Sequence, residues 1–361
     1  MTSLIASALL LAAAGSGAEW QKAAWSEPKE IGNYNVTVRL GDENSATENF
    51  VKFQGRRIAS DRIVTKPGEF VDYTFTARVP GPYTTRAKDE ASNRTLDILV
   101  MTKGAAPSDR KPAVEPAPEA PTIYLMGDST VTDQRNEPYG SWGQVLPAFV
   151  KPGWSCSNFA RSGLALKTAE GEGRLVRVLA HLKAGDWVVI QFGHNDQKIA
   201  GEEPEAGYTD RLNSWIDQID AKGGKVVLVT PVERRRFADD GTQQPQTLKG
   251  YADAVKAVAA KRGVPFIDLN AVSYHMMGVL GAKGSAALQC QPGRNKPLDN
   301  THHNIYGAYV HARTIAAGLA KIPVVGDAIR EGFREIDQDH PAANPRIPAS
   351  GNVDYTKPEG S

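Results

Sequence analysis

The sequence predicts an α/β fold with a parallel sheet, preceded by a small β-sandwich domain. Three features support this prediction: a strand-rich N-terminal part, a stretch rich in Pro and Ala, and a C-terminal part in which short apolar strands alternate with helical stretches. The chain has 361 residues, which is enough for one large hydrophobic core and one smaller module.

The first element is a predicted signal peptide at residues 1–18. An apolar run from Leu4 to Ala14 is followed by the sequence SGA, which fits a small-x-small cleavage site. Because no Lys or Arg precedes the apolar run, an apolar N-terminal helix or a disordered tail is the alternative. No other stretch approaches the ~20 apolar residues that a membrane span needs. We therefore expect a soluble product without a membrane span, either periplasmic or secreted.

Residues 19–103 form the predicted β-sandwich. The segments YNVTVRL, RRIASDRIVT, EFVDYTFTARV and TLDILVMT are rich in β-branched and aromatic residues and lie between clusters of Gly, Pro, Asn and Asp. The next segment, residues 104–121, is rich in Pro and Ala and is the predicted interdomain linker.

Residues 122–322 form the predicted α/β domain. The apolar strands TIYLMG, DWVVIQFG, KVVLVTP and VPFIDLN alternate with helical patterns at 174–183, 211–221 and 251–262. Unbroken apolar strands separated by helices indicate a parallel sheet buried on both faces, with its functional site beyond the carboxyl ends of the strands. Residues 323–361 form a polar, proline-rich C-terminal tail that we expect to follow the surface or to be disordered.

Composition gives little indication of a charged partner. The 42 Lys and Arg residues nearly balance the 41 Asp and Glu residues, so we expect neither nucleic acid nor an anionic membrane as partner. Cys156 and Cys290 could form one disulfide in an oxidising compartment or remain two buried thiols. Without a matching His cluster they do not form a zinc site. The sequence does not indicate the oligomeric state.

Ser129 is the candidate nucleophile. It follows the strand TIYLMG in the sequence GDS, where a glycine allows the backbone to turn sharply. At the carboxyl end of a strand its hydroxyl and backbone N–H can face the cleft, as a nucleophile with a neighbouring oxyanion donor requires. The alternative is an ordinary helix N-cap, since Asp, Ser and Thr all favour that position.

Two further segments carry candidate oxyanion donors. Gly163 ends the sequence NFARSG and could direct its N–H into the cleft, or it could be a plain turn glycine. Asn195 lies in the sequence GHND after a central strand, where its amide could face a developing oxyanion. The alternative for Asn195 is an Asx-turn without catalytic meaning. We expect Asp196 to hold this loop through hydrogen bonds to the backbone.

Asp299 and His302 are the candidate partners of the nucleophile. An Asp three residues before a His can bind one ring nitrogen and leave the other free to accept the serine proton. Capping of the following helix is the alternative. The spacing favours His302 over His303, which we expect to point elsewhere. Because the nucleophile, two oxyanion donors and the Asp-x-x-His pair occur in order along one α/β region, the sequence predicts a serine hydrolase.

These four segments resemble the sequence blocks of the SGNH (GDSL-type) hydrolase superfamily, and the resemblance covers roughly residues 122–319. It implies a three-layer α/β/α, flavodoxin-like domain. It also implies that Ser129 is the nucleophile, His302 the base and Asp299 its orienting carboxylate. The backbone N–H groups of Ser129 and Gly163 and the Asn195 side chain would form the oxyanion hole.

Within that superfamily the chain resembles the rhamnogalacturonan acetylesterases most. The resemblance rests on the stretches GDSTVTDQ, EPYGSWGQVLP, GDWVVIQFGHNDQK, TPVERRRF and DNTHHNIYGAY. Bacterial members of that family often carry an N-terminal β-sandwich similar to galactose-binding or carbohydrate-binding modules, which suits residues 19–103. The resemblance implies that acetyl groups are removed from an acetylated pectic polysaccharide through an acetyl-enzyme on Ser129, with neither a metal nor an organic cofactor.

Arg234 and Arg235 are candidate substrate-binding residues. They follow the strand KVVLVTP, where bidentate pairing of arginine with a uronic acid carboxylate is possible. The alternative is that they are solvated surface charges or partners of the nearby Asp239 and Asp240. Two other functions stay open: an esterase of the same superfamily that acts on another acylated glycan or a lipid, and a carbohydrate-binding protein with an inactive hydrolase fold.

Overall fold

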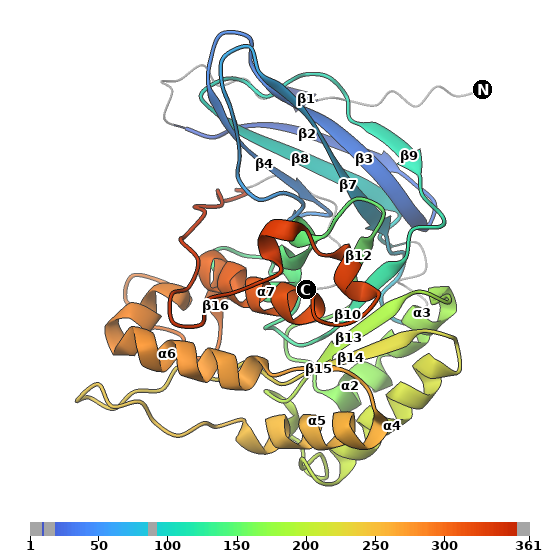
Figure 1. The fold of residues 1–361 in the computed structure, drawn as a ribbon, viewed down its shortest axis with the longest axis vertical. Helices are drawn as coiled ribbons and strands as arrows, with labels where there is room; N and C mark the ends of the chain where they lie inside the picture. The colour runs from blue at the N-terminus through green and yellow to red at the C-terminus, as the bar shows by residue number, and fades with distance from the viewer. Residues whose placement is uncertain (1–8, 11–18, 86–91, 352–361) are drawn as a thin grey trace.

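In the computed structural model, the strand-rich N-terminal part lies on one side of the α/β part (Figure 1). The structure describes residues 9–10, 19–85 and 92–351. The predicted signal peptide therefore lies outside the described residues apart from β1 (Leu9–Leu10), and export stays a prediction. Within these ranges no helix is long and apolar enough to cross a membrane.

An eight-stranded sheet forms the centre of the molecule, with the strand order β15-β14-β13-β10-β12-β7-β3-β9. Its first five strands are mutually parallel, as the sequence predicts. They are β15 (Phe266–Ile267), β14 (Lys225–Val229), β13 (Trp187–Gln191), β10 (Thr122–Gly127) and β12 (Ser155–Asn158). Every residue of β10, β12 and β13 is buried, because helices cover both faces of this part of the sheet.

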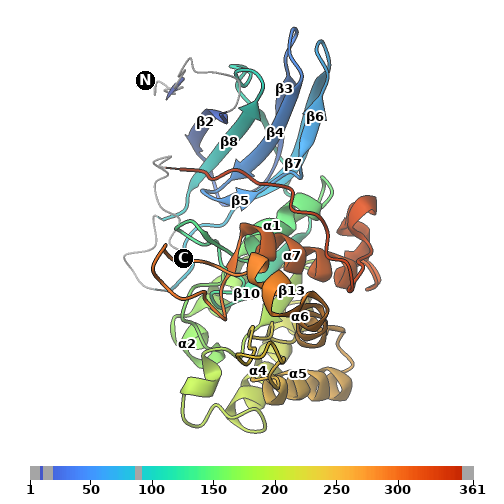
Figure 2. The same ribbon diagram turned by 90° about the vertical axis from the view of Figure 1, so that its left-hand side faces the viewer.

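Successive residues of β10 point to opposite faces of the sheet and pack into two separate cores. Ile123 and Leu125 belong to one core and Tyr124 and Met126 to the other. The first core is shared with α1 (Trp142–Val145), α6 (Leu269–Ser285) and α7 (Ile305–Leu319). The second is shared with α2 (Leu166–Gly171), α3 (Arg174–His181), α4 (Gly207–Asp220) and α5 (Lys249–Arg262). The predicted three-layer α/β/α arrangement is thus confirmed (Figure 2).

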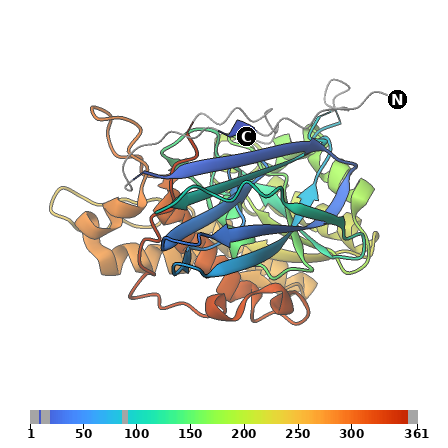
Figure 3. The same ribbon diagram turned by 90° about the horizontal axis from the view of Figure 1, so that it is seen from above.

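A second, antiparallel sheet covers the N-terminal side of the molecule (Figure 3). Besides β1 it contains β2 (Gln21–Pro28), β8 (Thr95–Lys103), β4 (Thr47–Phe53), β5 (Arg57–Ile58) and β6 (Ile63–Thr65). It packs against β3 (Gly32–Gly41) and β7 (Phe70–Val79) through a third core, to which Val38, Val51, Phe75 and Val100 contribute. Two sheets facing each other form the expected sandwich.

The sandwich and the α/β part share one sheet. β7 pairs in parallel with β12, with Thr76 opposite Ser155 and Ala77 opposite Cys156. The segment predicted as a linker also contributes a strand, β9 (Ala113–Pro116), which pairs antiparallel with β3. Pairing with β9 satisfies backbone groups along the outer edge of β3, which the composition of residues 104–121 does not reveal. The domain boundaries stay a prediction.

The C-terminal segment follows the surface between the two parts. After α7 it forms η5 (Val325–Ala328) and η6 (Glu331–Phe333) and then runs back to the antiparallel sheet (Figure 2). There the Lys52 side chain donates hydrogen bonds to the Pro348 carbonyl and the Ser350 hydroxyl. Both cysteines are unpaired and buried, so the structure adopts the thiol alternative rather than the disulfide.

Candidate active site

Ser129 follows β10 directly and lies in a turn held by the preceding aspartate. The Asp128 carbonyl accepts hydrogen bonds from the N–H groups of Val131 and Thr132 at 3.1 and 3.0 Å. The Asp128 carboxylate accepts the N–H and the hydroxyl of Thr130 at 2.9 and 2.8 Å. The GDS sequence thus forms a turn fixed from within, and Ser129 is placed at the carboxyl edge of the sheet as predicted.

Gly127 is required for space rather than for an unusual backbone angle. Its φ is not in the left-handed region, but a Cβ at this position would lie 2.4 Å from a Val131 methyl carbon and 2.8 Å from the Gln191 carbonyl oxygen. The sequence predicts that Gly127 allows the backbone to turn sharply. The structure gives another reason for glycine at this position, which is the lack of room for a side chain. The absent side chain lets the turn pack closely against β13.

Ser129, His302 and Asp299 form one hydrogen-bonded chain. The Ser129 hydroxyl lies 2.9 Å from Nε2 of His302, and Nδ1 of His302 lies 2.8 Å from Oδ2 of Asp299. Oδ1 of Asp299 accepts the backbone N–H groups of Thr301 and His302. Burial opposes ionisation of Asp299, but these hydrogen bonds, led by the one from His302, lower its pKa to about 2. The carboxylate is therefore ionised at neutral pH and fixes the orientation of the imidazole.

The segment around His302 is anchored on both sides. Cys290 donates its backbone N–H to the His302 carbonyl at 2.9 Å, and β16 (His303–Asn304) pairs antiparallel with β11 (Tyr139–Gly140). The Tyr139 ring meets the His302 ring edge-on, with centroids 5.8 Å apart. His303 points away into the interior, where its Nε2 lies 3.1 Å from Nε2 of His311. The choice of His302 over His303 agrees with this geometry.

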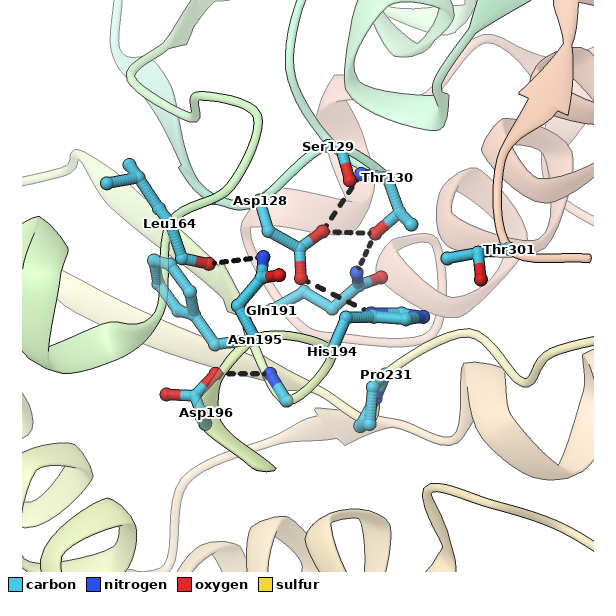
Figure 4. A network of polar contacts seen from close by, with 12 residues as sticks. Asp128, Ser129, Thr130, Leu164, Gln191, His194, Asn195, Asp196, Pro231 and Thr301 are labelled. Atoms are coloured by element: carbon cyan, nitrogen blue, oxygen red, sulfur yellow. Dashed lines mark hydrogen bonds and ion pairs between the residues drawn. The ribbon is translucent and has the colours of Figure 1, made fainter. Parts of the chain in front are cut away.

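Gly163 and Asn195 lie in two neighbouring loops beside the nucleophile turn. Gly163 is exposed and has a φ of +84°, so its backbone conformation favours glycine, although a Cβ there would meet open space. The Asn195 amide donates to the Leu164 carbonyl at 2.9 Å, which ties the two loops together. One of the two amide hydrogens is used in this bond, so the second can serve another acceptor. Figure 4 shows Asn195 and Leu164 next to Asp128 and Ser129.

Asp196 holds its own loop, as predicted. Its two carboxylate oxygens accept the backbone N–H groups of Leu166 and Gly193, both at 2.8 Å. Burial raises the pKa of Asp196 to about 7 despite these bonds, and the nearby Asp128 carboxylate adds to the increase. The contacts place Asp196 as the structural link between the Asn195 loop and the start of α2.

A buried polar network lies beneath the nucleophile, and the sequence interpretation missed it. His194 places Nδ1 at 3.2 Å from the Asp128 carboxylate. The Gln191 amide donates to the Thr130 hydroxyl and accepts the Trp142 indole N–H at 2.8 Å (Figure 4). The signal was present in the strand WVVIQ, where Gln191 is a polar residue in an otherwise apolar run. Such a residue must find partners when it is buried.

The structure separates the two predicted substrate-binding arginines. Arg234 lies beside the triad segment: its guanidinium donates to the hydroxyls of Thr301 and Thr247 at 3.2 and 3.1 Å. It also donates to the backbone carbonyl of His194 at 3.4 Å. All three partners are uncharged. Arg235 is instead held by the C-terminal end of α6, through the Ser285 hydroxyl and the Ala282 carbonyl. Only Arg234 is therefore placed with its positive charge close to the candidate site.

The matching family model is the GDSL-like Lipase/Acylhydrolase family, which covers residues 125–311. The curated relatives include the "Rhamnogalacturonan acetylesterase RhgT" of Bacillus subtilis (strain 168), which is 36% identical over 55% of this chain and 90% of its own length. The "Probable rhamnogalacturonan acetylesterase YesY" of the same organism is 33% identical over 58% of this chain and 98% of its own length. A crystal structure of YxiM from Bacillus subtilis matches 86% of both chains with 23% identity and a TM-score of 0.51. This last match supports the fold.

Proposed function

This chain belongs to the GDSL-like lipase/acylhydrolase family and is an ester-bond hydrolase, and from this premise we propose that it removes acetyl groups from a pectic polysaccharide, rhamnogalacturonan. The observation that carries the proposal is the chain of two hydrogen bonds that links the Ser129 hydroxyl through His302 to Asp299. A serine, an imidazole and a carboxylate in this arrangement are suited to acyl transfer.

The proposed reaction has two steps. In the first, the Ser129 hydroxyl attacks the acetyl carbonyl while Nε2 of His302 takes its proton, and His302 then protonates the departing sugar oxygen. In the second, a water molecule attacks the acetyl-serine, His302 takes the water proton, and acetate leaves as the proton returns to Ser129. In both steps Asp299 keeps the hydrogen on Nδ1 and stabilises the imidazolium.

We infer that three donors stabilise the oxyanion of each tetrahedral intermediate. They are the backbone N–H of Ser129, the backbone N–H of Gly163 and the second amide hydrogen of Asn195. The two loops that carry Gly163 and Asn195 are tied together by the bond from Asn195 to Leu164, so the donors are fixed before the reaction. Preorganised donors of this kind contribute about 10²–10³-fold each to kcat.

The pectic substrate is supported by two observations. Two of the relatives carry the name rhamnogalacturonan acetylesterase at 36% and 33% identity. In addition, Arg234 brings a guanidinium next to the Thr301 segment, and its hydrogen-bond acceptors are uncharged. Burial lowers the pKa of Arg234, although the nearby Glu233 and Asp128 carboxylates act in the opposite direction. Beside this segment the guanidinium could pair with the carboxylate of a galacturonate residue. A polysaccharide substrate also requires export, which residues 1–18 predict.

The test measures acetate release from acetylated rhamnogalacturonan and acetylated xylan by the wild type and by Ser129→Ala. We expect preferential release from the pectic polymer and a loss of at least ~10⁴-fold in the variant. Equal or greater release from xylan would keep the hydrolytic mechanism but overturn the pectic assignment. Activity of Ser129→Ala comparable to wild type would overturn the nucleophile.

A further inference from the structure

A pocket of about 300 Å³ lies where five segments of the chain meet. Its walls come from β4 and the turn after it, from the loop before β11, from α1 and from the start of α7, and residues 344–349 of the C-terminal segment close one side. This volume lies at the lower end of the ~300–1,000 Å³ range of small-molecule sites, so it suits one sugar residue better than a larger ligand.

The pocket adjoins the candidate active site along the chain on two sides. Glu137 and Pro138 line the pocket, and the next residue, Tyr139, packs its ring against His302. From the neighbouring strand and the start of α7, residues 304–306 also line the pocket and begin two positions after His302. A polymer whose acetylated residue lies at Ser129 would therefore pass close to this pocket.

Lys52 brings an ammonium group to the pocket wall from the antiparallel sheet. Its neighbours Val51 and Phe53 point into the sandwich core, so the strand alternation directs Lys52 toward the α/β part. Its Nζ donates to the Pro348 carbonyl at 2.5 Å and to the Ser350 hydroxyl at 2.9 Å. A protonated lysine has three donors, so one hydrogen is left for a ligand. Burial and repulsion from Arg56 lower the pKa of Lys52 to about 7, and an arriving anion would favour the protonated form.

Positive charge exceeds negative charge around the pocket. Arg56 pairs with Glu137 at 3.2 Å, and Glu137 also accepts the backbone N–H of Ser350 at 2.7 Å. Glu137 also attracts Lys52, but Arg56 repels Lys52 more strongly, and Lys52 has no ion pair with a carboxylate among the described residues. A carboxylate on the ligand would offset this excess.

Gln144 provides a second, independent feature that points to a ligand. Its side chain is 1% exposed and lines the pocket. The amide nitrogen donates to the Arg56 carbonyl at 3.0 Å, but the amide oxygen is buried without a hydrogen-bond donor among the described residues. A buried acceptor left unpaired costs about 1–3 kcal/mol. A sugar hydroxyl in the pocket would supply the missing donor.

We propose that this pocket is a saccharide subsite that binds a uronate residue of the substrate chain, separate from the residue that is deacetylated. Lys52 binds the carboxylate, and the amide oxygen of Gln144 accepts a hydrogen bond from a ring hydroxyl. The Tyr306 side chain provides a partly apolar surface on the pocket wall. The inference rests on the proposed function, because it assumes that the substrate is an acidic glycan. It gives the N-terminal sandwich a direct part in substrate binding.

The test is isothermal titration calorimetry of Ser129→Ala with oligogalacturonate and with neutral xylo-oligosaccharide. In this background we expect oligogalacturonate to bind and Lys52→Met to weaken its binding at least ~10-fold. Lys22→Met is the matched control: Lys22 donates to the Ser350 carbonyl at 2.7 Å but does not line the pocket. It tests whether loosening of the C-terminal segment alone explains the loss, and we expect less than a ~2-fold change.

Hydrolysis of 4-nitrophenyl acetate separates this subsite from the catalytic site. In the wild-type background Lys52→Met should leave kcat/KM for this small ester unchanged, which also shows that the variant is folded. Failure of oligogalacturonate to bind, equal binding of the neutral oligosaccharide, or an unchanged affinity in Lys52→Met would each overturn the subsite. Absence of esterase activity in the wild type would instead overturn the proposed function, and the calorimetry would still decide the subsite.

Discussion

Two aspartate–histidine pairs lie next to the turn that carries Ser129, and their surroundings differ. In each pair a carboxylate faces Nδ1 of the imidazole: Asp299 with His302 at 2.8 Å, and Asp128 with His194 at 3.2 Å. The first pair is 20% and 30% exposed, and Nε2 of its histidine meets the Ser129 hydroxyl. The second is 0% and 3% exposed, and Nε2 of its histidine is buried without a partner among the described residues.

The difference shows what distinguishes a reactive pair from a supporting one. An imidazole can exchange a proton only if its free nitrogen reaches a hydroxyl in a place that substrate can enter. His302 meets both conditions, whereas the His194 ring is enclosed. The Asp128–His194 pair instead stands beneath the turn that carries Ser129. We therefore expect the first pair to act on the reaction and the second to act on the stability of the nucleophile turn.

The largest expected effect comes from changing the reactive pair. Asp299→Asn removes the charge that fixes the His302 tautomer, so we expect kcat for 4-nitrophenyl acetate to fall about 10⁴-fold. Asn300→Ala, at the exposed neighbouring position, is the control and should retain activity. A loss of less than ~10-fold in Asp299→Asn would mean that His302 acts without its carboxylate.

The reactive pair could be predicted from sequence because its members lie three positions apart and its function needs those residue types. The supporting pair could not, since Asp128 and His194 are separated by 66 positions and no motif spacing connects them. The predicted role of Asp196 was accessible only in part: its bond from Gly193 spans three positions, whereas its bond from Leu166 spans 30 positions and joins the start of α2.

A smaller effect is expected from the supporting pair. His194→Phe leaves the buried Asp128 carboxylate without its imidazole partner, which should lower the free energy of unfolding by about 3 kcal/mol. We expect kcat to fall less than ~10-fold, because the triad is retained. Urea denaturation and steady-state kinetics on the same preparations measure the two effects.

The matched variant is His194→Asn, whose side-chain amide can replace the Nδ1 donor. It should recover more than half of the lost stability if the bond to Asp128 is what matters. Equal destabilisation by both substitutions would mean that the volume of the ring, rather than its hydrogen bond, supports the turn. A loss of activity in His194→Phe as large as that in Asp299→Asn would remove the distinction between the two pairs.

The fold could be predicted from sequence to about the same extent as the active site. In both cases local patterns are visible in the sequence and contacts between distant residues are not. Strands such as TIYLMG are apolar throughout because helices cover both faces, and this composition is visible in sequence. The continuation of the sheet from β12 into β7 depends on backbone pairing between Ser155 and Thr76, which leaves no mark in side-chain composition. The same holds for the contact of Lys52 with Pro348, which are 296 positions apart.

The smallest expected effect is a dependence of stability on pH that belongs to the reactive pair. The pKa of Asp299 falls from 3.8 to about 2 on folding. A carboxyl group with a depressed pKa stabilises the fold above its unfolded pKa, and this contribution is lost as the pH falls through the folded value. The contribution is about 2 kcal/mol at pH 5 by this relation.

The difference in unfolding free energy between the wild type and Asp299→Asn should therefore shrink by that amount from pH 5 to pH 2. A difference that stays constant over this range would mean that His302 and the two backbone N–H groups do not hold Asp299 ionised, and the contrast with the enclosed Asp128 would then rest on exposure alone.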